Sequence, residues 1–197
     1  MRGTRFNAMV AAGAGIALGI AAGRGVEVPA ASRLDKDTHT KEGRAVIAGA
    51  RYGHTNLIAR DWRRLARFYE EQFGCVPVPP ERDFTGPDLE RGTGIPGVAL
   101  RGAHLRLPGH GPDGPTLEIF NYNLLQEAPA TAVNRPGFGH IAFVVDDVPS
   151  ARQAVLAAGG RPVGGIVTLT TATGAKVTWV YVADPEGNVL ELQSWSK

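Results

Sequence analysis

The 197-residue sequence contains one cysteine, almost no excess of charge of either sign, and no apolar run of membrane-spanning length. A single cysteine excludes an intrachain disulfide and a CxxC metal or redox motif, so Cys75 is interpreted as a buried structural residue. The 21 Lys and Arg residues nearly balance the 19 Asp and Glu residues, which argues against a nucleic-acid-binding protein. A hydrophobic fraction of 43% predicts a chain that folds around a core.

The first 31 residues differ in composition from the rest of the chain. Arg2 and Arg5 precede an uncharged, Ala- and Gly-rich run over residues 8–23, and small residues follow around Ala30. This order is typical of a secretory signal, and the run is short for a membrane span. We expect residues 1–31 to export the protein (periplasmic or secreted) or to tether it to a membrane. If the segment does neither, a cytoplasmic protein is expected. Residues 32–50 are interpreted as a polar linker.

The rest of the chain contains an internal repeat. Gly-His at positions 53–54 recurs at 139–140, and Asp61 recurs as Asp147, so the offset is 86 residues in both cases. Each aspartate is a candidate helix N-cap, because apolar residues at helical spacing follow it. The predicted helices end at Gly74 and at the Gly159-Gly160 pair. A repeat of this kind predicts two βαβββ units, over residues 51–125 and 137–196.

Three strand candidates follow each predicted helix. They are residues 76–78, 98–107 and 116–122 in the first unit, and 162–171, 176–183 and 188–193 in the second. Glu118 and Glu191 both lie on the last strand of their unit, yet they are only 73 residues apart. The first unit therefore carries 13 extra residues, which we expect in the Pro- and Gly-rich segment 79–97 as a surface loop or a lid.

Two histidines and two glutamates occupy corresponding places in the two units. His54 and His140 open them, whereas Glu118 and Glu191 lie among apolar residues on the strands that close them. A carboxylate is costly to bury unless it is paired or binds a metal. Two imidazoles and two carboxylates suit one divalent Zn, Ni, Co, Fe or Mn ion with open positions for water or substrate. Taken singly, each histidine could be a hydrogen-bonded structural residue and each glutamate could face solvent.

From about Arg51 to Ser196 the chain resembles the vicinal oxygen chelate superfamily, which includes glyoxalase I, methylmalonyl-CoA epimerase, extradiol dioxygenases and bleomycin- or fosfomycin-resistance proteins. The run 184–192, Asp-Pro-Glu-Gly-Asn-Val-Leu-Glu-Leu, is the most specific part of the resemblance. The other motifs are Gly53-His54, Asp61, Phe68-Tyr69-Glu70, Phe73-Gly74 and the run 137–143. The resemblance implies an α+β fold in which two βαβββ modules form one cupped mixed sheet around a metal.

The resemblance also implies the ligands and the chemistry. The family's four ligand positions correspond to His54, Glu118, His140 and Glu191, and this set is most similar to that of glyoxalase I. The metal would act as a Lewis acid on a small molecule with vicinal oxygens, and Glu118 or Glu191 would move a proton on the adjacent carbon. The expected activity is that of a lyase or isomerase. A non-catalytic small-molecule-binding or resistance protein is the alternative, and a ring-cleaving dioxygenase is disfavoured because Glu118 occupies a position that is not a ligand there.

The substrate itself is not indicated by the sequence. Candidate pocket residues are Arg101, His104, Arg106, Tyr122 and Trp179, while His39 and His110 are expected in solvent. Because two units are fused in one chain, we expect the four ligands to meet within a monomer, although a homodimer is common for this fold.

Overall fold

The computed structural model describes residues 47, 49–127 and 129–196, and all of its helices and strands belong to the unit that begins at Gly49. The predicted signal-like segment and nearly all of the predicted linker lie outside the described residues. In the part of the chain that the structure describes, no helix is long and apolar enough to span a membrane.

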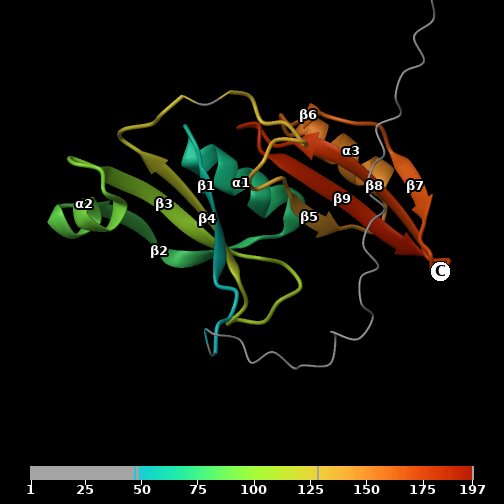
Figure 1. The fold of residues 1–197 in the computed structure, drawn as a ribbon, viewed down its shortest axis with the longest axis horizontal. Coiled ribbons are helices and arrows are strands. Elements are labelled where there is room, and N and C mark those ends of the chain that lie inside the picture. Colours follow the sequence, from blue (N-terminus) through green and yellow to red (C-terminus); the bar gives the residue numbers. More distant parts are fainter. Residues whose placement is uncertain (1–46, 48, 128, 197) are drawn as a thin grey trace, which may run out of the picture. The chain divides into compact units, whose positions relative to one another are not determined.

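Each module contributes its own sheet (Figure 1). The first sheet has the order β1-β4-β3-β2 and the second β5-β9-β8-β6, with β7 also paired to β8. The first module comprises β1 (His54–Ile58), α1 (Trp62–Phe73), β2 (Val76–Thr85), α2 (Pro87–Thr93), β3 (Ala99–Arg106) and β4 (Thr116–Tyr122). The second comprises β5 (Ile141–Val144), α3 (Val148–Ala157), β6 (Arg161–Pro162), β7 (Val167–Thr170), β8 (Lys176–Ala183) and β9 (Val189–Ser196). The predicted α+β fold of two βαβββ modules is confirmed.

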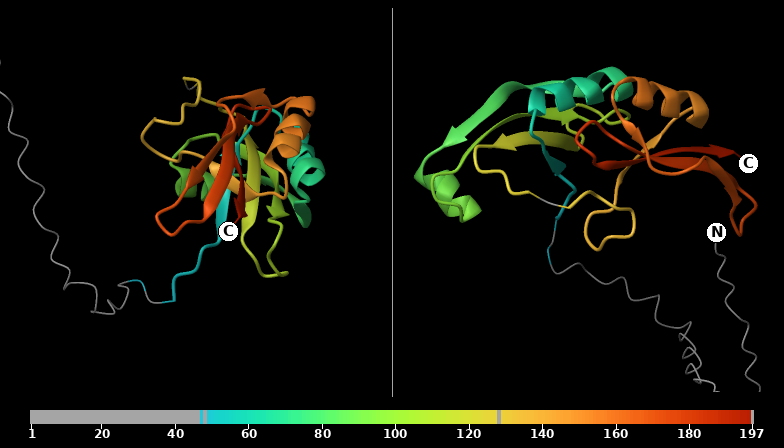
Figure 2. Two further views of the ribbon diagram at one scale, coloured as in Figure 1. Left: turned by 90° about the vertical axis from the view of Figure 1, so that its right-hand side faces the viewer. Right: turned by 90° about the horizontal axis from the view of Figure 1, so that it is seen from above.

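The helices begin and end where the sequence predicts. Asp61 and Asp147 cap α1 and α3, since their side chains accept hydrogen bonds from the backbone N–H groups of Arg64 and Ser150. Gly74 ends α1 in the left-handed conformation, with φ of 68°. Both helices lie on the same side of the molecule, each against the sheet of its own module (Figure 2). The other face of each sheet carries neither α1 nor α3.

The segment after α1 differs from the prediction. Residues 79–85 are not a loop but continue β2, which pairs with β3 around an irregularity between Val78 and Arg82, and α2 follows. His104 and Tyr181 hold corresponding register positions at an offset of 77, and Glu118 and Glu191 at 73. Nine of the 13 extra residues therefore precede β3, and the other four belong to the loop between β3 and β4.

One hydrophobic core spans both modules. The apolar face of α1 is buried as its spacing predicts, and the ring of Phe73 stacks on that of Phe143 with centroids 4.0 Å apart. Cys75 follows α1 and is also buried. Burial raises the pKa of its thiol to about 12, and the charge of Glu70 adds to the effect. These observations agree with a structural cysteine.

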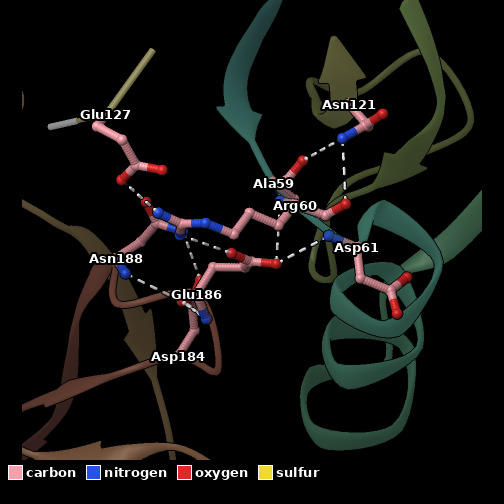
Figure 3. Close-up of polar contacts among 8 residues, drawn as sticks. All are labelled: Ala59, Arg60, Asp61, Asn121, Glu127, Asp184, Glu186 and Asn188. Carbon is pink, nitrogen blue, oxygen red and sulfur yellow. Dashed lines mark hydrogen bonds and ion pairs between the residues drawn. The ribbon is translucent and has the colours of Figure 1, made fainter. Parts of the chain in front are cut away.

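A polar clamp, made of Tyr69, Asp184, Glu186 and Asn188, fixes the β8–β9 turn to the first module. Figure 3 shows Asp184, Glu186 and Asn188 of this clamp. Asp184 is 0% exposed, and its carboxylate accepts hydrogen bonds from the Tyr69 hydroxyl at 2.9 Å and from Nδ2 of Asn188 at 2.8 Å. The backbone N–H groups of Glu186 and Asn188 also donate to it. Glu186 extends the clamp, because its Oε1 accepts from the backbone N–H groups at positions 60 and 61, where β1 leads into α1.

Replacing Tyr69 by Phe is expected to destabilise the fold by about 1.5–3 kcal/mol, because a buried carboxylate loses one donor while the packing of the ring is kept. Urea unfolding of the full chain measures this free energy. Tyr52→Phe is the matched control, since Tyr52 is 66% exposed, and should change it by less than about 0.5 kcal/mol. Equal effects of the two substitutions would contradict a clamp function for Tyr69.

Cys75 should make stability depend on alkaline pH. Its folded pKa of about 12 exceeds the ordinary value of 9.0, so the stabilisation from the neutral thiol is complete below pH 9.0 and is lost as the pH rises towards 12. Cys75→Ala should therefore show a shallower loss of unfolding free energy over this range, measured by urea unfolding at several pH values. Identical slopes for the two proteins, or rapid alkylation of the native thiol at pH below 9.0, would refute the assignment.

Candidate metal centre

The four predicted ligands form two pairs, one on each sheet. Nε2 of His54 lies 3.4 Å from Oε2 of Glu118, and Nε2 of His140 lies 3.1 Å from Oε2 of Glu191. Within residues 49–127 and 129–196, no group of three or more His, Cys, Asp or Glu side chains is placed to hold one ion. The expectation that all four meet within one chain is thus not met by this structure.

Glu118 occupies the middle of a row across three strands. Register places it opposite Asn56 of β1 and opposite His104 of β3. Nδ2 of Asn56 donates to its Oε2 at 3.3 Å, and Nε2 of His104 lies 3.0 Å from its Oε1. Glu118 is 8% exposed, as expected for a carboxylate among apolar neighbours, and polar groups approach both of its oxygens.

His104 is packed as well as paired. Its ring meets that of Phe120 edge to face, with centroids 5.8 Å apart, and the residue is half-buried. Burial lowers the pKa of His104 below its usual value, and the nearby Glu118 carboxylate opposes that shift without cancelling it. At neutral pH the side chain is therefore an uncharged imidazole.

Glu191 has a corresponding but more open environment. Register places it opposite Ala142 of β5 and Tyr181 of β8. The ring of Tyr181 lies 5.0 Å from that of His140 and 4.8 Å from that of Trp179. Burial raises the pKa of the Tyr181 hydroxyl, and the charge of Glu191 and a hydrogen bond to it raise it further. An aromatic surface therefore borders the second carboxylate.

The geometry of each pair fits two ligands of one divalent ion. Ligand atoms at about 2.0–2.2 Å from a metal, in tetrahedral or octahedral arrangement, are themselves about 2.8–3.6 Å apart. The imidazole-to-carboxylate distances of 3.4 and 3.1 Å lie within this range. Imidazole and carboxylate are the donors that Zn, Ni, Co, Fe and Mn accept. The residues present are therefore compatible with the expected metal.

The other predicted pocket residues are divided by the structure. Arg101 forms an ion pair with Asp83 on the surface, at 3.1 Å. Trp179 is half-buried beside Tyr181. Arg106 and Tyr122 are also half-buried, and within the described residues neither forms a hydrogen bond or ion pair with Glu118 or Glu191. His110 is exposed in the β3–β4 loop as predicted, and His39 lies outside the described residues.

Two neighbours of the carboxylates were missed by the sequence analysis as partners of the glutamates. Asn56 shares a strand face with His54, and that alternation was the signal that could have found it. Tyr181 required the register of β8 against β9, because the offset between modules changes from 86 to 77 before this position. The contact of His104 with Glu118 is hidden from the sequence for the same reason.

A cavity of about 990 Å³ lies away from the two histidine–glutamate pairs, between the end of β1, residues 125–127 and 129–131, and the β8–β9 turn. Arg60 lines it together with Glu127 and Glu186, with which it forms ion pairs at 3.0 and 3.6 Å (Figure 3). None of the four predicted ligands lines this cavity. Its charges are already paired in part, and it does not belong to the candidate metal centre.

Comparison with known proteins gives a family and a fold. The model of the Glyoxalase/Bleomycin resistance protein/Dioxygenase superfamily matches residues 51–192, while a search of curated proteins found no match. Among solved structures, the chain is similar to a glyoxalase family protein from Bacillus cereus, with 17% identity and a TM-score of 0.63 over 75% of this chain and 95% of that one.

Two further solved structures are similar at lower TM-scores. An integron cassette protein from V. cholerae is 25% identical over 75% of this chain and 96% of that one, with a TM-score of 0.43. A glyoxalase I mutant from Zea mays is 22% identical over 72% of this chain and 45% of that one, with a TM-score of 0.46. The fold assignment rests on the family model and on the Bacillus cereus structure.

Gly102 is required for the packing beside His104. A Cβ atom at this position would overlap the backbone oxygen of Ile119 and the ring of Phe120. Gly102→Ala should therefore lower the free energy of unfolding by about 1–3 kcal/mol. Gly92→Ala is the matched control, because Gly92 lies in α2 with open space around it, and should leave stability unchanged or raise it by up to about 1 kcal/mol. Thermal unfolding of both variants tests the difference, and equal midpoints would refute it.

Proposed function

The chain belongs to the Glyoxalase/Bleomycin resistance protein/Dioxygenase superfamily, and from this we propose that it is a metal-dependent enzyme that transfers a proton next to a carbonyl of a small molecule with vicinal oxygens. One observation carries the proposal: each module brings an imidazole Nε2 to the carboxylate of a strand glutamate at 3.4 and 3.1 Å. Such repetition in two modules is not expected of unrelated structural contacts.

Each of the four proposed ligands would have a stated role in this reaction. His54, Glu118, His140 and Glu191 would hold one divalent ion, which when bound polarises the substrate carbonyl and acidifies the neighbouring C–H bond. One of the two glutamates would take that proton on a carboxylate oxygen. A proton would then return from a glutamate to the adjacent carbon in an isomerisation, or to the other face of the same carbon in an epimerisation. No further reactant is needed, so the reaction class is an isomerisation, an epimerisation or a related lyase reaction. The assignment of the base stays open between Glu118 and Glu191.

Each chain supplies two half-sites, so we propose that the four ligands meet between two copies of the chain. Two observations favour this arrangement over a site within one chain. The two pairs lie on sheets that share no strand pairing, and no set of three ligands is close enough to hold an ion within the described part of the chain. In a twofold dimer, the first module of one copy and the second module of its partner would complete each site.

The metal is tested first, on the purified full chain. We expect about one divalent transition metal per chain by mass spectrometry, as four nitrogen and oxygen ligands should hold one ion. The double variants His54→Ala/Glu118→Ala and His140→Ala/Glu191→Ala should each lose it. A heterodimer of these two variants, purified with two different tags, would retain one intact site and about half the metal of the parent dimer.

The outcomes separate the alternatives. A metal-free heterodimer beside a metal-bound parent would refute a site shared between copies. Absence of metal from the parent after reconstitution would refute the enzyme proposal and favour the non-catalytic binding protein.

The chemistry is tested with 2-oxo compounds and thioesters as candidate substrates. NMR measures how fast the proton next to the carbonyl exchanges with deuterated solvent. Glu118→Gln and Glu191→Gln should each slow exchange by about 10²–10⁴-fold, because each removes a carboxylate that holds the metal or moves the proton. Circular dichroism should show that both variants remain folded. Unchanged exchange in both variants would refute the proposed mechanism.

A further inference from the structure

Beside its histidine, each proposed ligand carboxylate has a second polar neighbour on the adjacent antiparallel strand. In the first module this neighbour is His104 of β3, and in the second it is Tyr181 of β8. The two positions correspond, since each is directly opposite the glutamate in the antiparallel register of its sheet. Neither residue belongs to the motifs that carry the family resemblance.

The contacts of Glu118 engage its two oxygens separately. Oε1 lies 3.0 Å from Nε2 of His104, whereas Oε2 faces His54 at 3.4 Å and Asn56 at 3.3 Å. A carboxylate held through both oxygens from opposite sides has its plane fixed. With Oε1 occupied, only Oε2 is directed toward the proposed metal partner His54.

His104 is itself held in place. The Phe120 ring meets its imidazole edge to face, and the absence of a side chain at Gly102 makes room for that ring. In the second module, Trp179 packs edge to face against Tyr181 at 4.8 Å. Both donors are therefore fixed by aromatic packing, which is what a group needs in order to orient another.

We propose that His104 and Tyr181 are positioning residues that orient the Glu118 and Glu191 carboxylates for metal binding. This inference rests on the proposed function of the two glutamates as ligands. Groups that hydrogen-bond a metal ligand fix its orientation, and their loss typically costs about 10–100-fold in metal affinity. Neither residue touches the metal or the substrate in this proposal.

Metal affinity, measured by calorimetry with Zn²⁺ on the full chain, provides the first test. His104→Leu and Tyr181→Phe should each weaken binding about 10–100-fold, because each removes a donor to a ligand carboxylate. His104→Gln retains a side-chain N–H near the position of Nε2 and should restore most of the affinity. His110→Gln is the matched control, because His110 is exposed in the β3–β4 loop, and should bind as the parent does.

Unchanged affinity in both His104→Leu and Tyr181→Phe, beside a metal-binding parent, would overturn the inference. Loss of affinity that His104→Gln does not restore would overturn it for His104, since the ring rather than its donor would then matter.

A second measurement needs no metal and therefore separates this inference from the proposed function. In the metal-free chain, ¹H–¹⁵N NMR of the imidazole groups should show His104 protonated at Nε2, with a proton signal shifted by its bond to Glu118. The chain has five histidines, so single His→Gln variants assign the signals. Glu118→Gln should move the His104 signal and leave that of His110 unchanged. A His104 signal that does not respond to Glu118→Gln would overturn the inference even if the parent binds no metal.

Discussion

Asp184 is a fully buried carboxylate in the β8–β9 turn of the second module, where that turn contacts α1 of the first. Burial alone raises the pKa of this group, and four hydrogen bonds offset that cost. Three of the donors belong to the turn itself, whereas the fourth is Tyr69 of α1, so the full set forms only when the second module lies against the first. Glu186, in the same turn, fixes the start of α1 through two backbone N–H groups. The arrangement of both sheets therefore depends on this clamp.

The buried acidic residues serve different purposes, and their hydrogen bonds distinguish them. Asp184 has donors enough for both oxygens and none of them is a histidine, which suits a structural carboxylate. Glu118 and Glu191 instead face imidazole nitrogens on the sheet faces that carry neither α1 nor α3. An imidazole can exchange that partner for a metal at the same nitrogen once the ring proton lies on Nδ1, whereas a backbone N–H cannot. The capacity for function thus lies in the pairs whose partners are exchangeable.

The sequence predicted what local pattern and repetition determine. The caps at Asp61 and Asp147 and the apolar face of α1 follow from spacing and the 86-residue offset. The sequence predicted one site of four ligands, whereas the structure shows one histidine–glutamate pair in each module. It missed the extension of β2 through residues 79–85. The prolines and charges of this segment are typical of a loop, but hydrogen bonding to β3 makes it a strand. It also missed Tyr181 and the contact of His104, since register across strands is set by tertiary structure.

In the proposed arrangement, each chain carries two half-sites, and folding would not require the metal. Each carboxylate is already paired with an imidazole inside its own module, so neither half-site leaves a buried charge without a partner when metal is absent. The chain can therefore fold before it binds an ion, unlike small domains that need a metal to form their core. In the proposed site, metal affinity would then depend on how closely two half-sites approach and how firmly each carboxylate is oriented. Fold stability and metal affinity can consequently change independently, the first through the Asp184 clamp and the second through the strands that carry the glutamates.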